Sequence, residues 1–389
     1  MQIDFDLHGI VGVRLLNAGP RDLAAVARQL GPIQSPLDRR PDIVIRFVDR
    51  LTPRGRLRYL GLDEAAFTDD AFYVVRSKHK TGVKVQIPFG EIGSQCEFVC
   101  ERGVPAVPWL IPTINLTALA RGAMPLHASA FNFRGTGVVV TGWSKGGKTE
   151  ALLAFMARGA EYVGDEWVYI SGDGRLVSGI PEPVRLWDWH LRQLPAFRAK
   201  VSRGRRAKLR ALKAIRSACA LMPSPNFERI AQMLQRQLHV DMPPESLFGT
   251  GAAAYSGRFD RLFFVASHES PDIVVESMEP DEVARRMISS LAYERRDFMA
   301  LYRMFRFAFP HVENRLIEHA DQVQCELLPR VLQNKPAAAV YHPYPVSIPA
   351  LFEAMEPLVA AGDDRQRNPS AVAAIEPAVR THREQVAAI

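Results

Sequence analysis

Cysteine is scarce in this chain. Among its 389 residues there are only four, namely Cys96, Cys100, Cys219 and Cys325, and no two of them form a C-x-x-C pair. Such sparse thiols exclude a disulfide-rich secreted scaffold and a zinc site built from paired cysteines. They suit a protein of the reducing cytoplasm.

Long apolar runs and a basic N-terminus are also missing. No stretch approaches the ~18 apolar residues that a transmembrane helix requires. The chain begins Met-Gln-Ile-Asp-Phe-Asp and lacks the positively charged start of a signal peptide. We therefore expect a cytoplasmic protein without a membrane partner. Because 47% of the residues are hydrophobic, the chain can build one large or two moderate domains.

Acidic residues are absent from one basic segment. Between Arg192 and Arg216 there are ten Lys or Arg residues and no Asp or Glu, in a chain of net charge +7. Apolar residues recur at three-residue spacing within it, at Leu209, Leu212 and Ile215. This pattern predicts a basic amphipathic helix.

Three interpretations of that helix stay open. It is a solvated face packed by its leucines, a clamp for an acidic substrate, or a surface for nucleic acid or membrane. No aromatic residues interleave with the charges of residues 203–216, which disfavours the third. The candidate substrate-binding residues of the clamp are Arg203, Arg205 and Arg206.

The most specific motif is a phosphate-binding loop. Residues 142–149 fit G-x-x-x-x-G-K-[ST], after a predicted strand at 136–141 and before a predicted helix at 150–158. Inward N–H groups and the helix N-terminus would hold phosphate oxygens, Lys148 would reach the β- and γ-phosphates, and Thr149 would bind Mg²⁺. A simple glycine turn is the alternative. The expected nucleotide-binding residues are Gly142, Trp143, Ser144, Lys145, Gly146, Gly147, Lys148, Thr149 and Glu150.

Candidate catalytic residues flank the loop. His127 precedes Lys148 by 21 residues, and the pair Asp165-Glu166 follows a predicted strand at 161–163. An acidic pair at the end of a strand beside a P-loop strand typically supplies Mg²⁺ ligands and a catalytic base. The alternatives are a solvated strand end for the pair and a satisfied core histidine for His127.

Together these motifs resemble the C-terminal catalytic domain of HPr kinase/phosphorylase, and more closely the looser group of HPr-kinase-like proteins of unassigned substrate. The resemblance is carried by residues 126–129 (LHAS), 142–150, 158–159 (RG) and 163–166 (VGDE). It implies that Asp165 takes the proton from the acceptor hydroxyl and that Glu166 helps hold Mg²⁺, although the family usually has Asp there. It also implies that His127 lies close to the transferring phosphate.

The chain departs from the family pattern at three places. Lys145 stands where the family usually has glycine, as an extra cation over the phosphates or as a solvent-exposed side chain. The signature associated with the phosphorylase reaction is absent, and its nearest equivalent is residues 179–186 (GIPEPVRL). There Glu182 is a candidate metal ligand and Arg185 a candidate phosphate contact, with exposed loop charge as the alternative. The N-terminal region does not match the usual regulatory domain, so we do not expect HPr as substrate.

The predicted fold is α/β, a P-loop kinase core of the HPr kinase C-terminal-domain type. We expect an N-terminal α/β region at 1–105, a catalytic domain at 106–360 with a basic helical insertion at 191–250, and a mobile tail at 361–389. Helices are predicted at 20–30, 111–121, 203–216, 281–301, 312–334 and 348–359. Strands are predicted at 42–48, 72–76, 83–88, 96–100, 261–266, 273–276 and 337–341.

The sequence thus predicts an ATP-dependent, Mg²⁺-requiring kinase. The acceptor would be a hydroxyl, foremost a serine of a peptide or protein, with a small metabolite as a further option. The alternative is a nucleotide-binding regulatory module or slow ATPase, and a nucleic-acid-associated NTPase is disfavoured because no nucleic-acid module is recognisable. The family often assembles into homo-oligomers. Trp143 would cover the nucleotide or the acceptor, or simply pack beside the loop.

Overall fold

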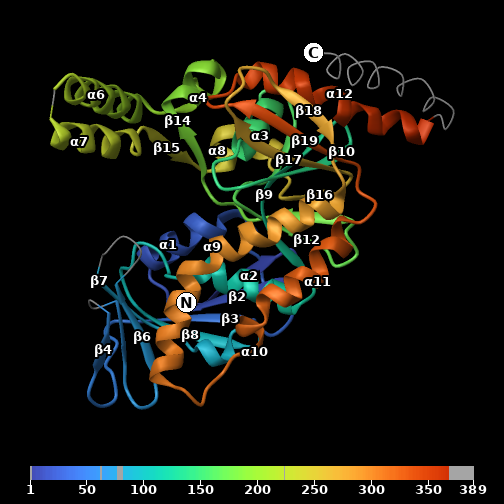
Figure 1. Ribbon diagram of the computed structural model, residues 1–389. Coiled ribbons are helices and arrows are strands. Elements are labelled where there is room, and N and C mark those ends of the chain that lie inside the picture. Colours follow the sequence, from blue (N-terminus) through green and yellow to red (C-terminus); the bar gives the residue numbers. More distant parts are fainter. Residues whose placement is uncertain (1, 62–63, 77–81, 223, 368–389) are drawn as a thin grey trace.

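Two large mixed β-sheets organise the chain in a computed structural model that describes residues 2–61, 64–76, 82–222 and 224–367 (Figure 1). The α/β class predicted from the sequence is confirmed. The first sheet has the order β1-β2-β3-β8-β7-β6-β5-β4. Its strands are β1 (Gln2–Leu7), β2 (Val11–Leu16), β3 (Ile43–Val48), β4 (Arg58–Leu60), β5 (Ala65–Phe67), β6 (Phe72–Arg76), β7 (Gly82–Gln86) and β8 (Cys96–Glu101).

The first sheet buries alternate residues, as strands with one covered face do. Cys96, Phe98 and Cys100 of β8 are buried, so both thiols belong to the core, and burial raises the pKa of each to about 12. These two thiols are therefore inert packing groups. The sheet is accompanied by α1 (Pro20–Leu30) and two short 3₁₀ turns (Gly31–Ile33 and Phe89–Glu91).

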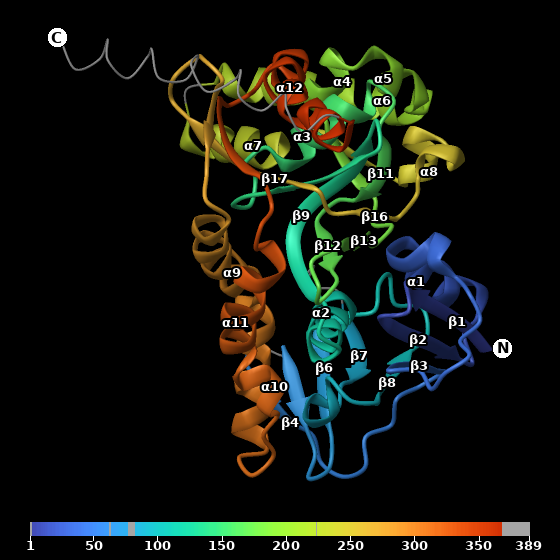
Figure 2. The same ribbon diagram turned by 90° about the vertical axis from the view of Figure 1, so that its right-hand side faces the viewer.

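Helices from the C-terminal half complete the core of the first sheet. They are α9 (Pro280–Ala308), α10 (Arg315–Glu318) and α11 (Ala320–Leu332). The ring of Phe305 of α9 lies edge-on to that of Phe72, with 5.8 Å between the ring centroids. The ring centroids of Phe298 and Phe89 are 5.5 Å apart. All four side chains belong to one buried cluster. The N-terminal region therefore shares its hydrophobic core with a segment some two hundred residues away in the chain, and both views show these helices beside the first sheet (Figure 2).

The second sheet has the order β16-β13-β12-β9-β10-β17-β19-β18, and β11 also pairs with β9. The parallel neighbours β10, β17 and β19 are rich in apolar residues, as is typical of strands covered on both faces. Its strands are β9 (Met124–Phe133), β10 (Thr136–Thr141), β11 (Glu161–Gly164), β12 (Trp167–Ile170), β13 (Leu176–Gly179), β16 (Ser256–Arg258), β17 (Arg261–His268), β18 (Val274–Ser277) and β19 (Ala337–Pro343).

Strand β10 separates two hydrophobic cores. Val138 and Val140 point to a cluster with α3 (Lys148–Met156) and α12 (Ile348–Arg367), whereas Val139 points to the cluster of α9. This alternation follows from the two-residue period of a strand. Helix α2 (Leu110–Ala120) leads into β9, which runs from the region of the first sheet into the second (Figure 2).

The basic insertion forms a side structure on the second sheet. Strands β14 (Val184–Trp187) and β15 (His239–Met242) pair with each other and support two helices that project from the body (Figure 1). We call residues 203–236, which contain both helices, the α6–α7 arm. The helices of this region are α4 (Asp188–Gln193), α5 (Pro195–Lys200), α6 (Arg203–Ala220), α7 (Pro225–Gln235), α8 (Pro244–Phe248) and the 3₁₀ turn Thr250–Ala252.

Most predicted elements are present with small shifts of their ends, including the basic helix, which is α6. Ten strands of the described residues were not predicted: β1, β2, β4, β5, β9, β12, β13, β14, β15 and β16. Helix α12 extends to Arg367, beyond the expected start of the tail at 361, and residues 368–389 lie outside the described residues. No described helix is long and apolar enough to cross a membrane.

Candidate active site

A glycine-rich loop joins β10 to the N-terminus of α3. Gly147 has φ of +110°, and a Cβ there would lie 2.1 Å from His342 Nε2. At Gly142 a Cβ would lie 2.2 Å from the carbonyl oxygen of Val265. Only glycine fits either position, because the left-handed conformation and the close neighbours both exclude a side chain. The loop therefore has one backbone course with its N–H groups next to a helix N-terminus.

The side chain of His342 of β19 supports this loop. Its ring is fully buried, and Nε2 donates a hydrogen bond to the carbonyl oxygen of Gly146 at 2.9 Å. A peptide unit is planar and trans, so a carbonyl held toward β19 turns the N–H of Gly147 away from β19. His342 thereby fixes the direction of one N–H group at the position where a loop of this kind meets an anion.

Lys148 carries a cation inside the loop. Its Nζ donates hydrogen bonds to the carbonyl oxygens of Gly142 at 3.2 Å and Trp143 at 3.0 Å. Burial lowers the pKa of Lys148, although the carboxylates of Glu166 and Asp165 oppose the shift. The ammonium group is held by two neutral carbonyls and by no ion pair among the described residues, which leaves its charge for an anionic ligand.

Asp165 and Thr149 form the second part of the site. Asp165 follows β11, and its Oδ2 accepts a hydrogen bond from Thr149 Oγ1 at 3.0 Å. Only 3% of Asp165 is exposed. Burial, together with the neighbouring charge of Glu166, raises the pKa of Asp165 to about 7. A carboxylate with such a pKa can both hold and release a proton near neutral pH.

His127 lies between two carboxylates. Its Nε2 donates to Glu166 Oε2 at 3.0 Å, and its Nδ1 lies 3.3 Å from Glu294 Oε1 of α9. Burial alone would lower the pKa of His127, but the two carboxylates outweigh it and raise the pKa. Trp167 stacks on the ring at 5.5 Å. Both ring nitrogens thus face carboxylates, an environment that favours the protonated ring.

Glu166 has a strained backbone. Its φ is +68°, a left-handed conformation that costs a non-glycine residue about 1 kcal/mol or more. The hydrogen bond from His127 lowers the pKa of Glu166, against the opposing effect of burial. Strain of this kind is typical of functional sites, because the surrounding structure must maintain it.

Two residues of the segment 179–186 lie within electrostatic range of the acidic pair. Burial, followed by the charges of Glu166 and Asp165, raises the pKa of Glu182 to about 8. The guanidinium of Arg185 contributes to lowering the pKa of Glu166 and is itself anchored by Asp241 at 2.8 Å. The segment 179–186 therefore places one carboxyl and one cation where their charges act on the acidic pair.

Other predicted site residues have different surroundings. The carboxylate of Glu150 accepts a hydrogen bond from the buried His190 at 2.9 Å, so one of its two oxygens is committed to that histidine. Lys145 is exposed with φ of +64°, the conformation for which glycine is preferred. Trp143 is 47% exposed and lies 4.9 Å from Tyr293 of α9, so it packs at the lip of the loop.

The residues present suit a hydrated Mg²⁺ ion. Mg²⁺ in phosphoryl-transfer sites uses one or two protein oxygens, with water and phosphate oxygens as its other ligands. Among the described residues no ion pair holds the buried carboxylate of Asp165, and the hydroxyl of Thr149 lies beside it. Within the described residues, no group of three or more His, Cys, Asp or Glu side chains forms an all-protein metal site. The donor set therefore fits a metal that arrives with a phosphate ligand.

Three contributors to the site were not predicted from the sequence. Glu294 pairs with His127, His190 pairs with Glu150, and His342 pairs with the loop. The first and third of these contacts join residues more than 160 positions apart in the chain. A histidine at the end of the apolar strand β19 is the one irregularity that draws attention to His342. The predicted clamp residues Arg203, Arg205 and Arg206 lie at the base of the arm, where Arg205 donates to the carbonyl oxygen of Asp241 at 3.2 Å.

Comparisons with known proteins give little further information. The structure of the HPr(Ser) kinase/phosphatase from Coxiella burnetii is a neighbour with 14% sequence identity and a TM-score of 0.20. The match covers 48% of this chain and 99% of that chain. No family model matches the chain, and no curated protein matches it. A TM-score this low carries no argument, so the functional case rests on the geometry of the site.

Proposed function

We propose that the protein is an ATP-dependent kinase of the HPr-kinase-like type that transfers the γ-phosphoryl group to a hydroxyl, foremost a serine of a peptide or protein. The observation that carries the proposal is the contact between Thr149 and Asp165 at the mouth of the glycine-rich loop. It brings together a phosphate-binding backbone, a candidate metal ligand and a carboxyl with a pKa of about 7. Phosphoryl transfer requires little more than such positioning and charge neutralisation.

The roles of the chain's own residues follow from their surroundings. The loop N–H groups and Lys148 bind the phosphate oxygens, and Asp165 accepts the proton of the acceptor hydroxyl. His127 is a positioning residue, since its Nε2 donates a hydrogen bond to Glu166 and its Nδ1 lies 3.3 Å from Glu294. Thr149, Glu166 and Glu182 would hold Mg²⁺, which neutralises charge on the phosphates when bound.

The proposal also includes the parts of the chain. The catalytic domain would comprise residues 106–360 and bind ATP and Mg²⁺, while the arm and Arg185 would face the acceptor. Supporting evidence for that orientation is the chain of contacts from Arg205 to Asp241 and from Asp241 to Arg185, whose charge acts on Glu166. A cytoplasmic location and a homo-oligomer remain part of the proposal.

A second candidate function is a nucleotide-binding regulatory module or slow ATPase. It is favoured by the hydrogen bond that commits one oxygen of Glu166 to His127, since a ligand for Mg²⁺ would then have only the other oxygen free. Both functions require ATP binding, and only the kinase requires an acceptor.

The test uses γ-labelled ATP, Mg²⁺ and a size-fractionated lysate of the source cell, with wild type and Asp165→Asn in parallel. Label that enters an acceptor only with the wild type supports the kinase, and the labelled fraction identifies the acceptor as protein, peptide or metabolite. ATP binding without acceptor-dependent label favours the regulatory module. Failure of the wild type to bind ATP refutes both.

A further inference from the structure

The α6–α7 arm concentrates the positive charge of the molecule. Residues 203–236 contain nine Lys or Arg residues and a single acid, Glu228, whereas the whole chain has a net charge of +7. The excess on the arm is thus larger than the net charge of the entire chain, and the rest is close to neutral. A surface of this kind attracts an acidic partner.

The arm also exposes large apolar side chains. Helix α6 buries only Leu209 and Cys219, and α7 buries none. Leu221 at the tip is 85% exposed. Large apolar groups in such number on a projecting element mark an interaction surface. The others that are exposed are Ile215, Met222, Ile230 and Met233.

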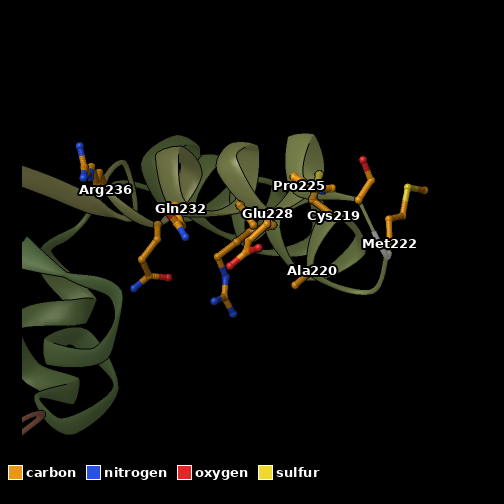
Figure 3. A pocket seen from close by; sticks show the side chains of 11 residues that line it. Cys219, Ala220, Met222, Pro225, Glu228, Gln232 and Arg236 are labelled. Atoms are coloured by element: carbon orange, nitrogen blue, oxygen red, sulfur yellow. The ribbon is translucent and has the colours of Figure 1, made fainter.

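An open groove of about 870 Å³ lies along the two helices (Figure 3). Figure 3 shows Glu228, Gln232 and Met222 along it, and Cys219 and Ala220 also contribute to its wall. Arg216 lines the groove as well, and its Nε is enclosed without a hydrogen-bond partner. An unpaired guanidinium N–H in a groove wall fits a carboxylate, which guanidinium binds through two parallel hydrogen bonds.

The base of the arm lies beside the reaction centre. Arg205 contacts the carbonyl oxygen of Asp241, whose carboxylate pairs with Arg185, and the charge of Arg185 reaches Glu166. Lys213 lies 3.5 Å from Asp188 of α4, and no residue further along α6 makes an ion pair with the body among the contacts described. A segment bound in the groove is therefore tethered near the site without blocking it.

We propose that this groove docks an acidic amphipathic helix of the protein or peptide acceptor, with one of its carboxylates on Arg216. The inference rests on the proposed kinase function, to which it adds the chemistry of the acceptor. A helix fits because the groove is long, concave and partly apolar, so apolar anchors at helical spacing can enter it while carboxylates face the surrounding cations.

The features of the arm disfavour other macromolecules. None of its exposed large apolar side chains is aromatic, whereas single-stranded nucleic acid binds largely by stacking on aromatic rings. A bilayer needs apolar side chains on a convex face, and Met222, Cys219 and Ala220 line a concave one.

The test is a selection of displayed helical peptides on the full-length chain. The library fixes leucines at helical spacing and samples Glu, Lys and Ser elsewhere, and enriched peptides are labelled with fluorescein and measured by anisotropy. Glu should be enriched, and Arg216→Gln should weaken binding about tenfold or more. Ala220→Trp fills the groove from an exposed position and should weaken binding to a similar extent. The matched control is Arg210→Gln, which removes the same charge from an exposed position of α6 outside the groove and should change binding less than about twofold.

Each contrary outcome overturns the proposal in a defined way. No enrichment of Glu excludes an acidic partner. Equal losses in Arg216→Gln and Arg210→Gln reduce the effect to general charge attraction. Tighter binding of single-stranded RNA, or of phosphatidylcholine vesicles containing phosphatidylserine, with the same dependence on Arg216 assigns the groove to nucleic acid or membrane. ATP affinity of the wild type is measured separately, so peptide binding without ATP binding refutes the kinase and leaves the docking site standing.

Discussion

Replacing Asp165 with asparagine should stabilise the protein while it stops phosphoryl transfer. Asp165 is buried beside Glu166, and this environment raises its pKa from 3.8 to about 7. The ionised carboxylate is therefore unfavourable in the folded, metal-free protein. An amide has nearly the same shape, keeps an oxygen for the hydrogen bond from Thr149 and carries no charge. It cannot accept the proton of an acceptor hydroxyl.

The sign and size of the stability change follow from proton linkage. A carboxyl with a raised folded-state pKa binds more protons in the native than in the unfolded state, so stability falls as pH rises from about 4 to about 7. The full difference between the unfolded and the folded pKa of Asp165 sets an upper limit on the lost stability. This limit is about 4 kcal/mol above pH 7 and about 1.5 kcal/mol at pH 5. Because Asp165 and Glu166 titrate together, we expect about half of each. Asp165→Asn should thus gain about 2 kcal/mol at pH 8 and under about 1 kcal/mol at pH 5.

Urea unfolding of the metal-free protein at the two pH values measures this gain. Asp69→Asn is the control, since the Asp69 side chain is 88% exposed in a surface ion pair and should contribute less than about 0.5 kcal/mol. In parallel, Asp165→Asn should keep ATP affinity within about threefold and lose about 100-fold or more of transfer activity. A variant no more stable than wild type at pH 8, or one that retains activity, would refute the reasoning.

Three further perturbations test the same site. Lys148→Ala should abolish nucleotide-dependent activity and weaken ATP binding, measured by fluorescence with a labelled ATP analogue; unchanged affinity would mean that the ammonium does not meet phosphate. His342→Phe leaves the Gly146 carbonyl unsatisfied at a cost of about 1–2 kcal/mol and should weaken ATP binding about 5- to 30-fold, whereas His342→Gln retains a donor at a similar reach and should recover most of the loss. Equal losses in both variants would show that the ring only packs. Glu294→Gln removes one of the two carboxylates that raise the pKa of His127, so the alkaline limit of activity should move to lower pH, as seen in pH–rate profiles and in NMR titration of the ring; an unmoved limit would remove His127 from the activity profile.

Local signals in the sequence predict the centre of the site well. The strand β10, the loop and α3 follow one another directly, so glycine spacing, Lys148 and the apolar run before them suffice. Asp165 is predictable because it ends a strand close behind the loop. The arm helix is also predictable, since its charge and apolar spacing are properties of a single helix.

Other parts depend on contacts that no local pattern records. Glu294 lies on a long helix with many charged residues, and nothing distinguishes it until α9 packs against β9. The segment 124–133 mixes apolar residues with His127, Ser129 and Asn132 and has no strict alternation, so its sequence does not mark the strand β9. The alternation in β1 is present in the sequence, with Ile3, Phe5 and Leu7 buried, but a run of 6 residues is too short to distinguish a strand from a chance pattern.

Helix α9 determines how the protein can be divided. Phe298 and Phe305 of α9 pack in the core of the first sheet. On the same helix, Tyr293 contacts Trp143 of the loop and Glu294 lies beside His127. A chain shortened to begin at residue 106 would leave those phenylalanines without Phe72 and Phe89 and expose them to water. Loosening that end of the helix would also loosen the carboxylate beside His127. The N-terminal region is therefore a structural requirement of the candidate active site, and a partner that binds this region gains a physical route to that site.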